Sequence, residues 1–374
     1  ALGDAERAVY ESGLTPNANE LAACARSGDL VILHDPQTAG LAEHAKKLGC
    51  LVVWRCHVGV DNPNEHTRAG WDFLRPYLEP FVDHYVASNA RFLPSWVPTD
   101  RISAVWPSID PFTPKNQELS DATVKAILHH VGIIAGAPGD TTFERIDGTP
   151  GRIERHCDII RTGPAPGPEV PLVVQISRWD SMKDMGGVME AFATYVDSGR
   201  TTQLVLAGPV VTAVADDPEG GQILQDCWKQ WRALPHSVRA RVQLVCLPMR
   251  DLEENAVIVN ALQRHATVVV QKSIAEGFGL TVAEAMLKRT PVVASAVGGI
   301  VEQVIDGETG RLIQDPADLE AFGAAVCTIL DDDELARRYG EAGRRRALEL
   351  HLSDTHLSEW LGVIEAVLSH STTA

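Results

Sequence analysis

The sequence has no two cysteines at the close spacing of a zinc site or a redox motif, although it has seven cysteines in 374 residues. An odd number of scattered cysteines is typical of reduced thiols in the cytosol and indicates neither a disulfide framework nor a structural zinc ion. The seven positions are Cys24, Cys50, Cys56, Cys157, Cys227, Cys246 and Cys327.

Long hydrophobic runs and positive charge are also scarce. No apolar segment is long enough to span a bilayer, and the opening residues ALGDAERAVYESG contain no signal-peptide core, so we expect a cytoplasmic protein without a membrane partner. Lys and Arg number 33 against 50 Asp and Glu, which gives a net charge of -17. A nucleic-acid surface requires clustered Lys and Arg, so we expect no nucleic-acid partner.

The composition is otherwise that of a globular protein. Apolar residues make up 45% of the chain and charged residues 22%, so a large core can be buried. At about 150 residues per domain, the length leaves room for two domains. Short apolar runs alternate with helical patterns along most of the chain, which predicts an α/β fold.

The most informative stretch runs from Val268 to Gly299 and reads VVVQKSIAEGFGLTVAEAMLKRTPVVASAVGG. Its β-branched start predicts a buried strand, and the glycines that follow Glu276 allow a tight turn that another group can approach closely. Residues 280–288 have helical spacing, and residues 291–294 begin another strand. We therefore predict a βαβ unit whose helix N-terminus lies beyond the carboxyl end of the sheet, where a phosphate would be stabilised.

Two carboxylates flank this glycine turn, Glu276 and Glu284. Taken alone, Glu284 completes a capping box that begins at Thr281, and Glu276 is a solvated loop acid. Because both bracket a glycine turn after a buried strand, we favour a binding role for both.

Polar side chains also follow two predicted strands near the N-terminus. His34 and Asp35 come after the first strand, and Arg55 and His57 come after the second. Ligands in open α/β sheets bind beyond the carboxyl ends of the strands, so these residues predict a shared cleft.

Two cations follow the predicted strand 171–176. Arg178 and Lys183 would be unremarkable on a surface, but here they lie at a carboxyl end that can face the Glu276 turn. Two cations in that position would neutralise a diphosphate and stabilise the charge that grows on it as a bond breaks.

Taken together, these motifs resemble the nucleotide-sugar site of retaining glycosyltransferases with two Rossmann-like lobes facing a crevice, the GT-B fold. The resemblance covers roughly Asp29 to the C-terminus, and its narrower match is to the trehalose synthase and trehalose phosphorylase branch. The general match rests on Glu276–Leu280 with Glu284, Pro291–Ser295 and Val297–Gly299; the narrower match rests on His34–Gln37, Trp54–His57, Pro107–Asp110, Asn260–Arg264 and Gln271–Ser273.

The resemblance implies a role for each residue. Arg178 and Lys183 hold the donor diphosphate, Glu276 faces the hydroxyls of the transferred sugar, and His57 contacts that sugar; these four are the expected catalytic residues. For Asn260, helix packing is an equally good interpretation. The expected donor-binding residues are Gly277, Phe278, Gly279, Leu280, Thr281, Glu284 and Asn260, and the expected acceptor-binding residues are His34, Asp35 and Arg55.

The same resemblance implies the mechanism. The departing phosphate takes the acceptor proton, and a covalent Glu276 nucleophile is the competing mechanism. No metal or separate cofactor is expected, because Arg178 and Lys183 take the place of a cation, and a nucleotide diphosphate glucose is the donor substrate.

The expected division is an acceptor-side lobe with linker over residues 1–168, a donor lobe over 169–352, and a C-terminal helix over 353–374 that packs back on the first lobe. The resembled enzymes open their first lobe with a strand and a glycine-rich loop, which nothing before Asp29 supplies. We therefore expect either a truncated or processed chain or a first lobe that is reduced at its start.

Three functions remain open. The first is transfer of glucose from UDP- or ADP-glucose to glucose or a similar sugar, forming trehalose or a related α,α-1,1-linked disaccharide, and a ribose contact by Glu284 favours it. The second is a trehalose phosphorylase that uses inorganic phosphate, and the third is a non-catalytic nucleotide-sugar binder. The expected partners are a small sugar and a nucleotide-sugar, and a homodimer is left open.

Overall fold

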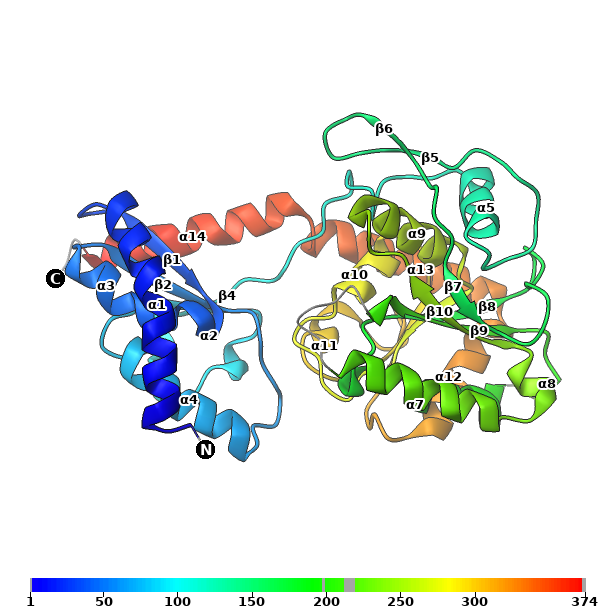
Figure 1. Ribbon diagram of the computed structural model, residues 1–374, viewed down its shortest axis with the longest axis horizontal. Coiled ribbons are helices and arrows are strands. Elements are labelled where there is room, and N and C mark those ends of the chain that lie inside the picture. Colours follow the sequence, from blue (N-terminus) through cyan, green and yellow to red (C-terminus); the bar gives the residue numbers. More distant parts are fainter. Residues whose placement is uncertain (1, 197–198, 212–218, 372–374) are drawn as a thin grey trace. The chain divides into compact units, whose positions relative to one another are not determined.

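The structure, a computed structural model, describes residues 2–196, 199–211 and 219–371 (Figure 1). The chain divides into two compact units, one formed by residues 1–107 with 354–374 and the other by residues 108–353. Each unit is built around its own parallel sheet.

The first unit contains a four-stranded sheet in the order β1-β2-β3-β4, with every pair of neighbours parallel. His34 pairs in register with Arg55, so the first two strands end at the same level. This register brings the polar residues that follow both strands to one edge of the sheet. The strands are β1 (Leu30–His34), β2 (Leu51–Cys56), β3 (His84–Ala87) and β4 (Ile102–Ala104).

Helices cover both faces of this sheet because alternate strand residues point to opposite sides. Trp54 and Tyr85 pack on the face covered by the helices of the N-terminal part, whereas Val53 packs against Val363 and Val367 of the C-terminal helix. The helices are α1 (Asp4–Cys24), α2 (Asp35–Thr38), α3 (Ala42–Lys47), α4 (Glu65–Leu78) and α14 (Ser353–Ser371), with short turns η1 (Ala39–Leu41), η2 (Ala90–Phe92) and η3 (Thr99–Arg101).

The second unit contains a seven-stranded sheet in the order β13-β12-β11-β8-β9-β10-β7. All neighbours are parallel except β7, which runs antiparallel to β10. The strands are β7 (Asp158–Ile160), β8 (Leu172–Ile176), β9 (Gln203–Pro209), β10 (Val242–Leu247), β11 (Val268–Gln271), β12 (Val292–Ser295) and β13 (Arg311–Ile313).

The order of these strands creates a switch point. The chain builds outward from β8 through β9 to β10 and then returns to place β11 on the other side of β8. Connections on opposite sides of the sheet leave a crevice at the carboxyl ends of β8 and β11, which is where open α/β sheets bind ligands.

Helices lie on both faces of the second sheet, and Figure 1 shows α9 and α10 on one face and α7 and α12 on the other. Strand residues are buried on both sides, as expected for a parallel sheet. The helices are α6 (Met185–Ala191), η5 (Phe192–Val196), α7 (Gly220–Ala233), α8 (His236–Arg239), α9 (Leu252–His265), α10 (Leu280–Leu287), α11 (Ile300–Gln303), α12 (Leu319–Leu330) and α13 (Asp333–Leu350), with the turn η4 (Ser181–Lys183).

Residues 108–168 differ from the expected linker of the first lobe, because the structure assigns them to the second unit. They form α5 (Asp121–His130), a small hairpin of β5 (Thr142–Glu144) and β6 (Pro150–Arg152), and the edge strand β7. Ile127 and Ile134 are fully buried in the core of the second unit. Three-residue strands between prolines and glycines give too little periodicity to be recognised in the sequence.

Two further features bear on cellular context. Among the described residues, no helix combines the length and the hydropathy needed to cross a membrane. All seven cysteines are free thiols.

Candidate functional site

The centre of the candidate site is an ion pair between Lys183 and Glu276. The Nζ atom of Lys183 donates to the Oε2 atom of Glu276 at 2.7 Å, and the two side chains are only 15% and 12% exposed. Lys183 ends the turn that follows β8, and Glu276 lies in the loop that follows β11. The pair therefore joins the two strand ends that flank the switch point.

Further hydrogen bonds also join the two loops. Gln175 of β8 donates to the carbonyl of Lys183 at 2.6 Å and accepts from the amide of Lys272 at 3.0 Å. Ser273 donates to the Glu276 carboxylate at 3.2 Å. The Glu276 carboxylate is thus held by Lys183 of the loop that follows β8 as well as by Ser273 of its own loop.

A second ion pair, Lys272 with Asp184, lies beside the first. Lys272 is 2% exposed, and Asp184 has a left-handed backbone with φ of 45° and caps α6 through the amide of Gly187 at 3.0 Å. Neither residue was predicted from the sequence to have a role. The motif Gln271–Ser273 was the available signal, because Lys272 is a charged residue directly after a strand that is apolar over three positions.

The glycine turn is built by close backbone contact with a second glycine pair. A Cβ atom on Gly298 would lie 1.6 Å from the carbonyl oxygen of Glu276, and the amide of Gly299 donates to the carbonyl of Gly277 at 3.0 Å. Gly279 adopts φ of 89° and is the N-cap of α10. The Val297–Gly299 motif therefore supports the turn that carries Glu276.

Glu284 does not form a capping box with Thr281. Helix α10 begins after Gly279 without a side-chain cap, which leaves Glu284 too far along the helix for that role. Instead its side chain is 4% exposed and pairs with Lys115 at 2.8 Å, and Gln263 donates to it at 3.4 Å.

The structure does not bring Asn260 together with the other donor-binding candidates. Asn260 is fully buried, and its amide nitrogen donates to the carbonyls of Pro114 at 3.1 Å and Gln117 at 2.9 Å. Its side-chain oxygen accepts from Arg264 at 2.9 Å, one helical turn further along α9. These contacts are those of a residue that holds a neighbouring segment.

Arg178, the other expected phosphate ligand, has a different environment from Lys183. Its side chain is 58% exposed and donates to Asp180 at 2.8 Å, while the second oxygen of Asp180 caps the turn η4 through the amide of Met182. The cation of Arg178 is therefore presented to solvent at the carboxyl end of β8.

Lys288 is a buried lysine next to this site. Its Nζ atom donates to Asn116 at 2.8 Å and to the carbonyl of Glu284 at 3.3 Å, and the residue is 6% exposed. Burial lowers the pKa of Lys288 to about 7, although the charge of Glu284 opposes this shift.

Replacing Lys288 by Met should flatten the pH dependence of stability. Between pH 7 and the ordinary lysine pKa of about 10.4, the unfolded chain binds one proton more than the folded chain, so the free energy of unfolding rises with pH by about 1.4 kcal/mol per unit. Urea unfolding at pH 7, 8 and 9 should show this slope in the wild type and its loss in Lys288→Met. Equal slopes in both proteins would contradict the lowered pKa.

The acceptor-side candidates form a separate cluster in the first unit. The Nδ1 atom of His34 lies 2.9 Å from the Nε2 atom of His57, and the two rings stack. The carboxylate of Asp35 accepts from the amide of His57 at 2.7 Å, and Arg55 donates to the His57 ring at 3.4 Å. The structure thus brings together all four residues predicted after the first two strands.

Residues of α14 that the sequence analysis did not identify complete this edge of the sheet. The guanidinium of Arg55, 3% exposed, lies over the ring of Trp360 at 5.2 Å, and burial lowers the pKa of Arg55. His356 contacts the carbonyl of Trp106 at 2.6 Å, and Glu359 accepts from the Trp106 amide at 3.2 Å. Burial raises the pKa of Glu359. A helix at the far end of the sequence gave no signal for these contacts.

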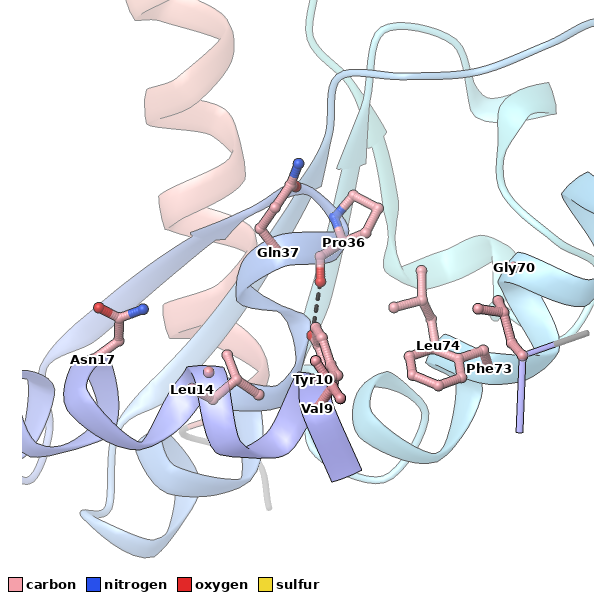
Figure 2. Close-up of a pocket in the computed structure, with 11 residues that line it drawn as sticks. Val9, Tyr10, Leu14, Asn17, Pro36, Gln37, Gly70, Phe73 and Leu74 are labelled. Carbon is pink, nitrogen blue, oxygen red and sulfur yellow. Dashed lines mark hydrogen bonds between the residues drawn. The ribbon is translucent and has the colours of Figure 1, made fainter. Parts of the chain in front are cut away.

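An apolar pocket of about 540 Å³ lies elsewhere in the first unit, between α1 and α4 (Figure 2). Val9 and Leu14 of α1 and Phe73 of α4 line it, and the Tyr10 hydroxyl donates to the carbonyl of Pro36 at 2.7 Å. None of the candidate residues lines this pocket. Its apolar walls offer little to sugar hydroxyls.

Among the described residues, no group of three or more His, Cys, Asp or Glu side chains is arranged to hold a metal ion. The charged groups at the end of β8 and β11 are instead two lysines and an arginine with carboxylate partners. Cationic side chains at a switch point suit a phosphorylated ligand.

Two units with parallel sheets, and a cation–carboxylate centre at the switch point of one, define a GT-B glycosyltransferase. The model of the family described as glycosyl transferases group 1 matches residues 159–346, and that of the trehalose synthase N-terminal domain matches residues 1–94. The chain belongs to the group 1 glycosyltransferases, as a member of the trehalose synthase family.

Similar proteins agree with this assignment. Trehalose synthase from Rubrobacter xylanophilus is 33% identical to this chain over 91% of the chain and 70% of its own length. Trehalose phosphorylase from Pleurotus pulmonarius is 23% identical over 90% of the chain and 42% of its own length. An α,α-trehalose-phosphate synthase (UDP-forming) from Burkholderia vietnamiensis shares the fold with a TM-score of 0.68 at 15% identity, covering 99% of this chain and 78% of its own.

Proposed function

We propose that this chain transfers a glucosyl group from a nucleoside diphosphate glucose to glucose or a similar sugar, with retention of the α configuration. The product is trehalose or a related α,α-1,1-linked disaccharide. The observation that carries the proposal is the Lys183–Glu276 pair at the switch point, 2.7 Å apart and largely shielded from water.

In this reaction the bond between C1 of glucose and the diphosphate oxygen breaks. The acceptor hydroxyl oxygen bonds to C1 on the same face, and its proton passes to the departing diphosphate. Lys183 and Arg178 stabilise the charge that develops on the diphosphate, and electrostatic stabilisation of this kind supplies much of the rate enhancement in many enzymes. Glu276 hydrogen-bonds a hydroxyl of the transferred sugar.

The contacts of Glu276 support this role over that of a covalent nucleophile. Lys183 and Ser273 already donate to the same oxygen of its carboxylate, which lowers its reactivity toward carbon. In the first unit, Arg55, His57, His34 and Asp35 are the proposed contacts of the acceptor and the transferred sugar.

Two observations favour a transferase over a phosphorylase. The chain is 33% identical to a trehalose synthase and 23% identical to a trehalose phosphorylase. Glu284 is also buried within α10, and its carboxylate can accept hydrogen bonds from ribose hydroxyls. The free thiols of all seven cysteines support a cytoplasmic location.

The test is to mix the protein with glucose and UDP-, ADP- or GDP-glucose. We expect release of one nucleoside diphosphate together with a non-reducing disaccharide, and NMR of the anomeric protons should show the α configuration at both anomeric carbons of its 1,1 linkage. Phosphate-dependent cleavage of trehalose without any nucleotide binding would contradict the proposal. Tight nucleotide binding without turnover would leave only the binding function.

A further inference from the structure

We name the segment Pro114–Glu118 the strap. Side chains of the motif Asn260–Arg264 on α9 form hydrogen bonds with its backbone. Asn260 donates to the carbonyls of Pro114 and Gln117, as described above. Arg264 donates to the carbonyls of Asn116 at 3.2 Å and Gln117 at 3.0 Å. The polar residues at both ends of the motif thus bind the backbone of the strap.

Two more helices hold the strap through charged groups. Glu118 pairs with Arg264 at 2.7 Å and with Arg344 of α13 at 3.1 Å, and Lys288 after α10 donates to the side chain of Asn116 at 2.8 Å. A single exposed ion pair contributes little to stability, whereas several charged side chains that converge on one segment hold it more firmly. Side chains of α9 and α13 and of the residue that follows α10 thus hold the strap.

The strap places Lys115 on Glu284. The Nζ atom of Lys115 lies 2.8 Å from the Oε1 atom of Glu284, whose side chain is 4% exposed, while the Lys115 side chain is 40% exposed. Burying a carboxylate without a paired cation is strongly unfavourable. Among the ion pairs of the described residues, Lys115 is the partner of Glu284, and the neutral amide of Gln263 is a longer contact at 3.4 Å.

We propose that Lys115 is a positioning residue for the donor, which acts by holding the Glu284 carboxylate in the orientation that meets the ribose of a nucleoside diphosphate. The inference rests on the proposed function, because it assumes that such a donor binds. A carboxylate can accept about four hydrogen bonds, so Lys115 and Gln263 leave lone pairs for neighbouring hydroxyls. Through Lys115, the strap would thus influence donor affinity although it is not part of the βαβ unit that carries Glu284.

Calorimetric titration with UDP and ADP tests this inference. Lys115→Met should weaken binding of the preferred nucleotide by roughly tenfold, the effect of losing a charged hydrogen bond, and should leave kcat at saturating donor within about threefold. Lys125→Met is the matched control, because Lys125 is 44% exposed and pairs at 2.7 Å with Glu169, which is 83% exposed and lies outside the site. Its affinity should equal that of the wild type.

A structural role and a positioning role differ in which kinetic parameter they change. Lys115→Met should raise KM for the donor about as much as it weakens nucleotide binding and leave kcat at saturating donor nearly unchanged, whereas a general loss of structure would lower kcat as well. Lys115→Arg should restore most of the binding, and it keeps the test valid if the Met variant does not fold.

Unchanged affinity in Lys115→Met would overturn the inference. Tighter binding would also overturn it, since that result would mean that Lys115 competes with the donor for Glu284. A wild type that binds neither nucleotide would instead overturn the proposed function, and this inference with it.

Discussion

Replacing Glu276 by Gln should lower kcat/KM for glucosyl transfer by about a thousandfold. The substitution keeps the shape of the side chain but removes its charge, which leaves Lys183 without its partner at a site where both are mostly buried. Loss of one preorganised electrostatic contact in an active site costs about 10²–10³ in kcat. Loss of a buried partner adds to this, since the remaining charge is left uncompensated.

The double variant with Lys183→Met separates these two effects. Residues that act as a unit are strongly non-additive, so we expect the double variant to be no slower than the slower single variant. Lys183→Met should also weaken nucleoside diphosphate binding, whereas Glu276→Gln should mainly lower kcat. Nucleoside diphosphate release, measured over a range of donor concentrations, gives both parameters.

Lys46→Met is the control for loss of a partly buried lysine. Lys46 pairs with Asp83 at 2.6 Å in the first unit, with side chains 30% and 32% exposed. It should change thermal stability but not kcat. If the fold-losses in kcat/KM of Glu276→Gln and Lys183→Met multiplied in the double variant, the two residues would act independently, which would contradict a coupled pair.

The glycine turn could be predicted because its signals are local. A run of β-branched residues, closely spaced glycines and a helical pattern follow one another within the 32 residues of the stretch quoted above, and each restricts the backbone in its own way. Lys183 and Glu276 are 93 residues apart in the sequence. Their proximity could be predicted because ligand-binding residues of open α/β sheets lie at the carboxyl ends of neighbouring strands.

The strap could not be predicted in the same way. Asn260 and Gln117 are 143 residues apart, and neither has a neighbour that restricts its partner. The helical pattern of residues 255–264 places Asn260 on a helix but does not select the segment that it contacts. Such contacts depend on how helices pack, and periodicity alone carries no information about the partner.

The extent of the second unit was missed for a related reason. Ile127, Ile134, Phe143 and Ile153 are buried in its core, yet they lie among prolines and glycines without a sustained period. The prolines and glycines predict turns, but a segment rich in turns can still cover the face of a sheet. Burial here depends on individual apolar residues rather than on whole amphipathic elements.

Gly298→Ala should be the most destabilising single-methyl substitution in the second unit. Its Cβ atom would lie 1.6 Å from the Glu276 carbonyl oxygen, where heavy atoms prefer about 3.5–4.0 Å. The neighbouring atoms are backbone, so no side-chain rotation can relieve the overlap. We expect a loss of about 3–5 kcal/mol in the free energy of unfolding.

Gly307→Ala separates this steric clash from the cost of the backbone conformation. Gly307 has φ of 77° and Gly298 has φ of 55°, but a Cβ atom on Gly307 would meet no atom within 4 Å. An alanine with positive φ costs roughly 1 kcal/mol, so Gly307→Ala should lose only that amount and keep nucleotide binding. Urea unfolding measures the loss in the free energy of unfolding for each variant, and the difference between the two losses is the cost of the steric clash.

The same substitution links the turn to the chemistry. If Gly298→Ala folds, the turn must shift away from the new methyl group, and Glu276 moves with its own carbonyl. Since a displacement of about 1 Å can cost a hundredfold in rate, such a variant should lose transfer activity even at temperatures where it remains folded. Equal stability losses in both glycine variants, or full activity in Gly298→Ala, would show that the turn tolerates a Cβ atom and that Val297–Gly299 does not position Glu276.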